Sequence, residues 1–201
     1  IVSTMEELCK QIEELRAKNS KILNEKINEE LVQLEMKNAR FNAKVIEDGE
    51  FSINGKSHVE FVITTNLGEE EKKLNKIASG GEMSRIMLAI KTVLSDIDEV
   101  PVLIFDEIDT GISGKAANSV GSKLKKIAKK HQVIIVTHLA TIAAQGDYNY
   151  YIYKEVAANK TNTNVKLLNE SETIREIARI ASGEITEISL SHARELRNKN
   201  V

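Results

Sequence analysis

The sequence has one cysteine, one proline and no tryptophan in 201 residues, and each scarcity excludes a class of protein. The single thiol, Cys9, can close no disulfide within the chain, which argues against a secreted disulfide scaffold and favours a reducing, cytoplasmic environment. Pro101 alone interrupts the chain, so we expect long regular elements. The apolar runs have the length of a strand, and none approaches the ~20 residues of a membrane span, so no membrane partner is expected.

The sequence also lacks an excess of charge of either sign, because 28 basic residues nearly balance 30 acidic ones. A net charge of −2 argues against blanket neutralisation of phosphates, although one face can still be basic. Hydrophobic residues make up 41% of the chain, which excludes a disordered tail and predicts a buried core. The chain starts at Ile1 instead of an initiator Met, so we expect it to be part of a longer protein.

The first 48 residues carry apolar side chains at steps of three and four, the spacing of a coiled-coil helix. Two runs follow this spacing, and they are out of phase by one residue: Met5, Leu8, Ile12, Leu15, Asn19 and Ile22, then Ile27, Leu31, Leu34, Asn38, Phe41 and Val45. The phase change predicts a break or a local change of winding near Asn24. We therefore expect a coiled-coil segment over residues 1–48.

Residues 49–201 have the pattern of an α/β domain. Alternating runs at 50–53 and 58–65 around Asn54-Gly55 predict a hairpin. Apolar runs at 102–105 and 133–136 flank a helix expected over 115–130, which predicts two buried parallel strands joined by a crossover helix. Runs at 150–153 and 165–168 predict an antiparallel edge hairpin. Helices are expected over 172–180 and 190–197.

Two carboxylates, Asp106 and Glu107, come directly after the apolar run 102–105. The carboxyl end of a parallel strand is where α/β folds bind ligands. There one carboxylate can hold Mg²⁺ while its neighbour orients a water toward a phosphate. A hydrophobic run followed by Asp-Glu is common, so alone it does not establish a nucleotide site.

Three further motifs surround the carboxylates in the chain. Ser79-Gly80-Gly81-Glu82 precedes a helix, where amides and a hydroxyl can bind an anion; an ordinary serine N-cap is the alternative. His138 follows the second buried strand, at the same predicted sheet edge as Asp106, and its Nε2 can contact a phosphate. Residues 109–114 form a loop of small residues that permits close backbone approach.

In this order, within about 60 residues, the motifs resemble the C-terminal lobe of an ABC-type ATPase head. Residues 79–82 resemble its signature, Asp106-Glu107 its Walker B pair, residues 110–113 its D-loop, and His138 its switch histidine. The preceding coiled coil resembles the structural-maintenance-of-chromosomes branch. Within it, the stretch LIFDEIDTGISG at 103–114 is most similar to the RecN family of bacterial DNA repair proteins. Met83 departs from that family's usual Leu, and Ala140-Thr141 from its Pro-Gln.

The resemblance implies ATP and Mg²⁺ as cofactors and assigns roles to these residues. Asp106 would support the metal, Glu107 would act as general base, and His138 would stabilise charge on the γ-phosphate. The resemblance places the remaining residues at the nucleotide sandwiched between two heads: Ser79, Gly80, Gly81, Glu82, Asp109, Thr110, Gly111 and Ser113. It also implies a homodimer of heads, DNA as a partner of the full-length protein, and association with the nucleoid.

No phosphate loop of the form G-x-x-x-x-G-K-S/T occurs in the chain. Gly55-Lys56-Ser57 has its upstream glycine one residue too far away, and it lies between two strands. A second segment similar to the signature, residues 181–184, has only one glycine and follows a helix. We therefore expect it to be a helix C-cap. We expect the N-terminal half of the parent chain to supply the phosphate loop, and this chain alone to be nearly inactive as an ATPase.

Two other functions stay open from sequence alone. The chain could belong to another chromosome-organising or nuclease-associated ATPase, which the length of the missing coiled coil would distinguish. It could also be a coiled-coil interaction module without catalysis. Glu107 and His138 argue against the module, because a site without chemistry needs neither. The lysines over 115–130 favour a solvated face over a DNA contact.

Overall fold

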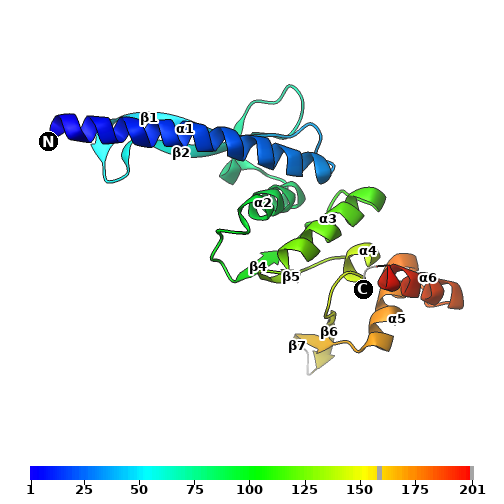
Figure 1. The fold of residues 1–201 in the computed structure, drawn as a ribbon. Helices are drawn as coiled ribbons and strands as arrows, with labels where there is room; N and C mark the ends of the chain where they lie inside the picture. Colours follow the sequence, from blue (N-terminus) through cyan, green and yellow to red (C-terminus); the bar gives the residue numbers. More distant parts are fainter. Residues whose placement is uncertain (158–159, 200–201) are drawn as a thin grey trace. The chain divides into compact units, whose positions relative to one another are not determined.

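The computed structural model describes residues 1–157 and 160–199 (Figure 1). The chain divides into two units, Ile1–Leu103 and Ile104–Val201. Unit 1 contains, in order, α1 (Val2–Gln33), β1 (Arg40–Ser52), β2 (Gly55–Thr64), β3 (Lys72–Lys73), the 3-10 helix η1 (Leu74–Lys76) and α2 (Gly80–Leu94). The boundary falls within β4 (Val102–Phe105). Unit 2 continues with α3 (Gly114–Ile127), β5 (Gln132–Ile135), α4 (Ala140–Ala143), β6 (Tyr150–Ala157), β7 (Lys160–Leu167), α5 (Glu170–Ser182) and α6 (Glu187–Asn198).

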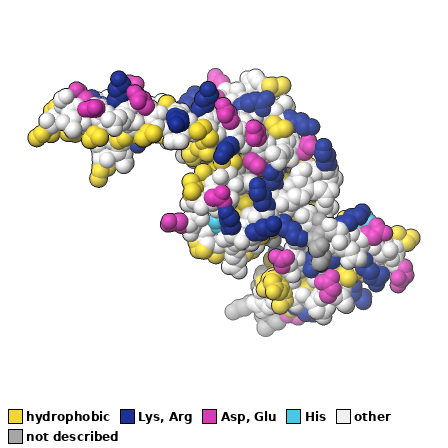
Figure 2. Space-filling model, viewed as in Figure 1, with side chains coloured by type: hydrophobic (Ala, Val, Ile, Leu, Met, Phe, Trp, Pro, Cys, Tyr) yellow, Lys and Arg dark blue, Asp and Glu magenta, His cyan; other side chains and the backbone are white. Residues whose placement is uncertain are grey.

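Helix α1 carries two apolar stripes, and only the second is buried. Leu8, Leu15 and Ile22 are exposed, whereas Ile27 and Leu31 are fully buried. Ile27 lies five positions after Ile22, so the two side chains point in directions about 140° apart around the helix. The phase change in the sequence therefore marks the point where the stripe passes from solvent into the core of unit 1. Apolar side chains gather along α1 and its hairpin in Figure 2.

The predicted helical period is wrong beyond Gln33, because β1 begins at Arg40. Phe41 and Ala43 are buried while their neighbours Asn42 and Lys44 are less so, which is the two-residue period of a strand. The spacing from Phe41 to Val45 fits both a helix and a strand. Pairing with β2 makes this segment a strand. The boundary at residue 48 between coiled coil and head remains a prediction.

Two asparagines of α1, Asn24 and Asn28, form hydrogen bonds with the backbone along the outer edge of β1. The backbone N–H of Phe41 donates to Asn28 Oδ1 at 2.8 Å, and the N–H of Ala43 donates to Asn24 Oδ1 at 2.7 Å. Asn28 Nδ2 also donates to the carbonyl of Phe41. An edge strand exposes such groups in every second residue, and the side chains satisfy them. These contacts explain why Asn24, where a break was expected, lies inside a continuous helix.

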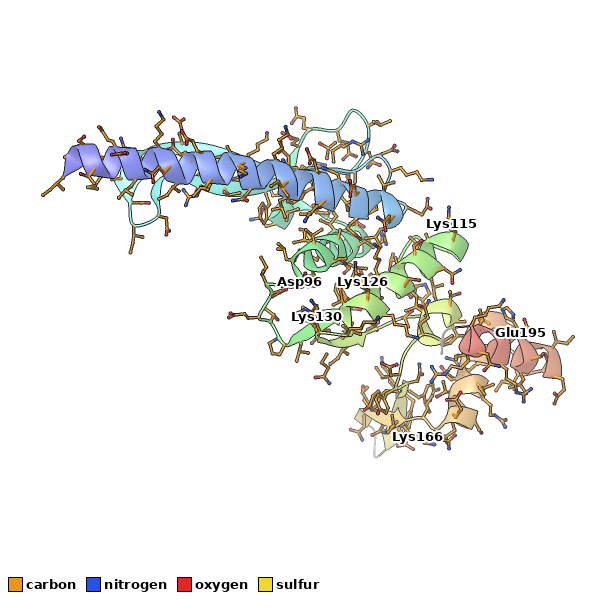
Figure 3. The ribbon with its side chains drawn as sticks, in the orientation of Figure 1. Asp96, Lys115, Lys126, Lys130, Lys166 and Glu195 are labelled. Atoms are coloured by element: carbon orange, nitrogen blue, oxygen red, sulfur yellow. The ribbon has the colours of Figure 1, made fainter. Side chains whose placement is uncertain are left out.

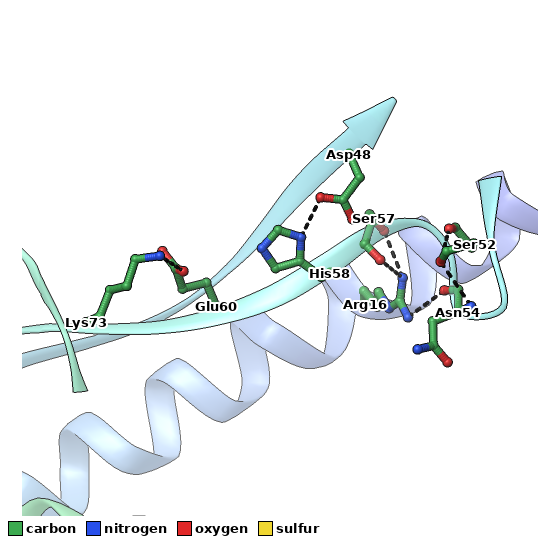
Figure 4. A network of polar contacts seen from close by, with 9 residues as sticks. Arg16, Asp48, Ser52, Asn54, Ser57, His58, Glu60 and Lys73 are labelled. Carbon is green, nitrogen blue, oxygen red and sulfur yellow. Dashed lines mark hydrogen bonds and ion pairs between the residues drawn. The ribbon is translucent and has the colours of Figure 1, made fainter. Parts of the chain in front are cut away.

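The tip of the β1–β2 hairpin is held by Arg16 (Figure 4). Its guanidinium donates to the carbonyl and hydroxyl of Ser57, at 2.5 and 2.9 Å, and to the carbonyl of Asn54 at 2.9 Å. The turn residues are Ile53 and Asn54, and Gly55 follows with φ of 95°. The predicted hairpin is thus confirmed, and the segment beginning at Gly55 is a strand and not a phosphate loop.

Ile27→Ala is expected to destabilise unit 1 by about 2–5 kcal/mol, because it leaves a cavity at a fully buried site. Denaturant unfolding of the chain measures the loss. Ile22→Ala is the matched control: it makes the same change on the same helix at an exposed position, and we expect less than about 1 kcal/mol. Equal losses for the two variants would contradict the assignment of the two stripes.

In unit 2, β4 and β5 form a two-stranded parallel sheet joined by the crossover helix α3, as predicted. The N–H of Val136 donates to the carbonyl of Phe105 at 3.0 Å, so the two strands end side by side. Helix α3 buries Val120, Leu124 and Ile127 along one side. Lys115, Lys126 and Lys130 mark its course and the turn after it (Figure 3).

The last third of unit 2 is a hairpin followed by two helices. Strands β6 and β7 pair antiparallel from Tyr150↔Leu167 onward, which confirms the predicted hairpin; Ala158 and Asn159 lie outside the described residues. Both helices begin with capping boxes, α5 two residues and α6 three residues earlier than predicted. Gly183 caps α5 with φ of 77°, so the C-cap prediction is confirmed.

The capping box of α5 includes a charged pair. Lys166 Nζ donates to Glu172 Oε1 at 2.6 Å, and the N–H of Asn169 donates to the other carboxylate oxygen. These bonds lower the pKa of Glu172, with the bond from Lys166 as the larger cause.

The helices α5 and α6 then pack on α4 around Ala144, Ile177 and Ala193, among other buried residues. No helix within the described residues is long and apolar enough to cross a membrane.

Candidate active site

The signature segment opens helix α2. Ser79 is its N-cap, and its hydroxyl accepts from the N–H of Glu82 at 3.4 Å. The amides of Gly80 and Gly81 belong to the first turn and have no acceptor within the helix. Ser79 and Gly80 are exposed, whereas Gly81 is buried and Glu82 is half-buried. The exposed start of this helix is suited to an anion, through its amides and its dipole.

The two carboxylates that resemble a Walker B pair, Asp106 and Glu107, follow β4 without a gap. Leu103 and Phe105 are buried in the strand, while Asp106 and Glu107 are both exposed at its carboxyl end. Glu107 has φ of 55°, in the left-handed region that costs a residue with a side chain free energy. The N–H of Thr110 donates to the carbonyl of Glu107 at 2.9 Å and closes a turn that holds it there. Backbone strain of this kind gathers at functional sites.

The small-residue loop leads from this turn into α3. Gly111 has φ of 76°, which only glycine adopts without strain. Thr110 and Ser113 are exposed, and Ser113 is the N-cap of α3 although its side chain makes no capping bond. The hydroxyl of Ser113 is therefore not committed to the helix that it precedes. Thr110, Gly111 and Ser113 thus form an exposed stretch between β4 and α3.

His138 follows β5 and is tied to the loop after β4 through Asp109. Asp109 Oδ2 accepts from the backbone N–H of His138 at 2.8 Å and from Thr137 Oγ1 at 2.5 Å. The same oxygen lies 3.2 Å from His138 Nδ1. The imidazole itself is largely exposed, whereas the Asp109 side chain is buried at 1% exposure. Asp109, which follows β4, thus contacts Thr137 and His138, which follow β5. The order of the motifs in the sequence indicated that these segments would lie together.

Asp109 differs from the other predicted nucleotide contacts because its side chain faces inward. Of the others, Gly81 is buried without a side chain and Glu82 is half-buried, while five are exposed: Ser79, Gly80, Thr110, Gly111 and Ser113. The signature residues 79–82 belong to unit 1, and residues 106–113 and His138 belong to unit 2. Unit 2 alone therefore brings together Asp109, Thr137 and His138, close to the turn that carries Glu107.

The site fits Mg²⁺ only as part of a nucleotide complex. Among residues 1–157 and 160–199, no three His, Cys, Asp or Glu side chains are grouped so that they could hold a metal ion. Mg²⁺ keeps several waters and is commonly bound through one or two carboxylates and the phosphates of a substrate. Asp106, an exposed carboxylate at the end of a strand, meets that requirement.

Two residues were given no role from sequence: Thr137, which supports the site, and Arg197, which holds the end of α4. Thr137 bridges Asp109 to the next turn, since its Oγ1 also accepts from the N–H of Leu139 at 3.1 Å. Arg197 of α6 donates to the carbonyls of Ala144 and Gly146 at the end of α4, the helix that follows His138. The hydroxyl directly before His138 was a usable signal. The reach of Arg197 across more than fifty residues was not.

Several curated proteins are similar in sequence to this chain. The DNA repair protein RecN of Halalkalibacterium halodurans is 43% identical over 179 residues, which are 87% of this chain and 32% of that protein. RecN of Haemophilus influenzae is 40% identical over 90% of this chain and 33% of its own length. RecN of Bacillus subtilis is 46% identical over 69% of this chain and 24% of its length. The chain thus spans about a third of the length of the first two relatives.

Solved structures with the same fold come from the Smc family. An Smc head domain with coiled coil and joint from Pyrococcus yayanosii matches 84% of this chain and 30% of its own, with a TM-score of 0.55 and 17% identity. An Smc head domain with an extended coiled coil from Pyrococcus furiosus, bound to the C-terminal domain of ScpA, matches 89% and 43%, with a TM-score of 0.52 and 18% identity. These likenesses show the fold, that of an ABC-type ATPase head.

No family model matches the chain. On the sequence matches, the chain belongs to the RecN family, as a segment about one third as long as its relatives.

Proposed function

We propose that this chain is the signature, Walker B and switch-histidine portion of an ATP-hydrolysing head in a DNA double-strand-break repair protein. One observation carries the proposal: Glu107, held with positive φ, and His138 follow two adjoining strands and are tied through Asp109. An exposed carboxylate and an exposed imidazole at one sheet edge suit proton transfer from water and contact with a phosphate. The names of the relatives support DNA repair as the setting.

Each exposed group has one chemical task in this proposal. Glu107 accepts a proton from the attacking water, and His138 stabilises charge on the γ-phosphate oxygens. Asp106 would hold Mg²⁺, which when bound neutralises phosphate charge. Ser79 and the amides of Gly80 and Gly81 contact the γ-phosphate of ATP held by a second head. That arrangement makes the active species a homodimer.

The rest of the parent chain is the other partner that the proposal requires. The chain has no phosphate loop, and the faces of its sheets are incompletely covered. Ile104, Ile134 and Val136 are exposed beside the β4–β5 pair, where parallel strands are normally buried on both faces. The β6–β7 hairpin likewise exposes Tyr150, Ile152, Val165 and Leu167. The N-terminal half of the parent protein would cover these faces and supply the phosphate loop.

Exposure of Leu8, Leu15 and Ile22 on α1 supports a coiled coil with a helix outside this chain. Opening and closing of the heads would act through that coil on bound DNA, and the protein would work at the nucleoid. The runner-up, a different chromosome-organising or nuclease-associated ATPase, shares the fold but not the sequence matches to RecN. A module without catalysis leaves the strained backbone at Glu107 without a purpose.

A complementation assay in the source bacterium tests the repair function. Deletion of the parent gene should raise sensitivity to agents that break both DNA strands, and the wild-type gene should restore resistance. Glu107→Gln in the full-length gene should fail to restore it, whereas the control Glu99→Gln, at an exposed acid outside the site, should succeed. A deletion strain with normal resistance would contradict a role in break repair.

A further inference from the structure

Asp109 is a buried carboxylate whose contacts all lead to one short segment. Its Oδ2 accepts from the hydroxyl of Thr137 and the backbone N–H of His138, and it lies 3.2 Å from His138 Nδ1. Removing a carboxylate from water is unfavourable unless hydrogen bonds replace the lost hydration. Here the replacing donors are the switch histidine and the residue before it. The buried carboxylate therefore holds this segment through hydrogen bonds. An apolar side chain at position 109 could not form them.

We propose that Asp109 is a positioning residue for His138: it fixes the ring by Nδ1 and leaves Nε2 as the atom that meets the γ-phosphate. The two ring nitrogens lie on different edges of the imidazole, so a contact at one directs the other away. Within the described residues the exposed ring makes no other hydrogen bond or ion pair, so without Asp109 it would rotate freely about its side-chain bonds. This inference rests on the proposed function, because it takes the role of His138 from there.

The same carboxylate also links two parts of the site. Asp109 lies two residues after Glu107, in the turn that the Glu107 carbonyl closes with Thr110. The backbone N–H of His138 and the hydroxyl of Thr137 are therefore anchored to the loop that carries the general base. A ring anchored in this way keeps a constant relation to Glu107. Such alignment matters, because displacement of a catalytic group by about 1 Å can cost on the order of 100-fold in rate.

The test is a double-mutant cycle on ATP hydrolysis by the full-length protein. Asp109→Asn keeps the shape of the side chain, but its amide donates as well as accepts, so the ring is no longer held in one orientation. We expect kcat to fall by about 10- to 100-fold with little change in KM. In a His138→Ala background the same substitution should change kcat by less than about twofold, because the residue acts through the imidazole.

A structural role alone would give a different result. Loss of the fold around Asp109 would lower kcat in the His138→Ala background as well, and additive effects would overturn the inference. Asp147→Asn, the same change at an exposed residue of unit 2, is the control that should leave activity unchanged. Thermal unfolding shows whether Asp109→Asn is folded. If it is not, Thr137→Val carries the test, since it removes one donor to Asp109 and keeps both Asp109 and His138.

Failure of this inference can be told from failure of the proposed function. If Glu107→Gln abolishes hydrolysis and His138→Ala lowers it, but Asp109→Asn and Thr137→Val leave kcat unchanged, the positioning role alone is overturned. If His138→Ala also leaves kcat unchanged, the role proposed for the imidazole falls and the positioning role falls with it. Non-additive losses in the cycle, with KM preserved, support both.

Discussion

Glu107→Gln in the full-length parent protein is expected to lower kcat for ATP hydrolysis by at least about 100-fold, because it removes a general base and keeps the shape of the side chain. ATP binding should be retained, since the substitution leaves the phosphate contacts in place. The fold should be retained too, because glutamine meets the same backbone cost as glutamate at φ of 55°. Steady-state hydrolysis and binding of a fluorescent ATP analogue measure the two effects separately.

Glu99→Gln is the matched control, since it makes the same chemical change at an exposed acid eight positions earlier in the chain. It should hydrolyse ATP at the wild-type rate. A Glu107→Gln protein that binds ATP and hydrolyses it at more than about a tenth of the wild-type rate would contradict the role of Glu107, because general bases contribute roughly 100-fold or more.

Ser79→Arg is expected to abolish hydrolysis as completely as Glu107→Gln, because a bulky side chain blocks the exposed start of α2 where the phosphate would be bound. The two inactive proteins should regain activity when mixed. Each mixed dimer has one site that combines an intact Glu107 with an intact signature from its partner. With random pairing and independent sites, the recovered rate is about a quarter of the wild-type rate.

The control is each inactive protein mixed with itself, and neither should recover. A mixture shown to exchange subunits, yet as inactive as its components, would contradict the sharing of one site between two heads. It would leave Glu107 as a base without the partner contact of Ser79. Ser79→Ala helps to separate the two contributions: it removes the hydroxyl and N-cap without blocking the amides, so we expect a smaller loss.

Much of the C-terminal part of the fold could be predicted, because its signals are local. A continuous apolar run such as 102–105 is typical of a parallel strand, and two such runs around a helix leave few topologies. The hairpin, whose turn begins one residue earlier than the predicted Asn54-Gly55, and the cap at Gly183 both use glycine's tolerance of positive φ. The order of the motifs then indicated that His138 and the loop after β4 would meet.

The remaining features depend on contacts between distant residues. Phe41 and Val45 fit both a helix and a strand, and β2 decides the outcome by pairing with Phe41 opposite Ile63. Asp109 and Thr137 are 28 residues apart, so no local pattern predicts that this carboxylate faces inward. The strands predicted at 102–105 and 133–136 were expected to be buried. Ile104 and Ile134 are instead exposed, since no element of the described chain covers them.

The most direct test of the account is ATP hydrolysis by this chain alone and after mixing with the remainder of its parent protein. The account predicts almost no hydrolysis by the chain alone, because it has no phosphate loop. It predicts Mg²⁺-dependent hydrolysis once the two parts assemble, and loss of that activity when the chain carries Glu107→Gln. A mixture that assembles and binds ATP but hydrolyses none, or hydrolysis by the chain alone, would contradict the account.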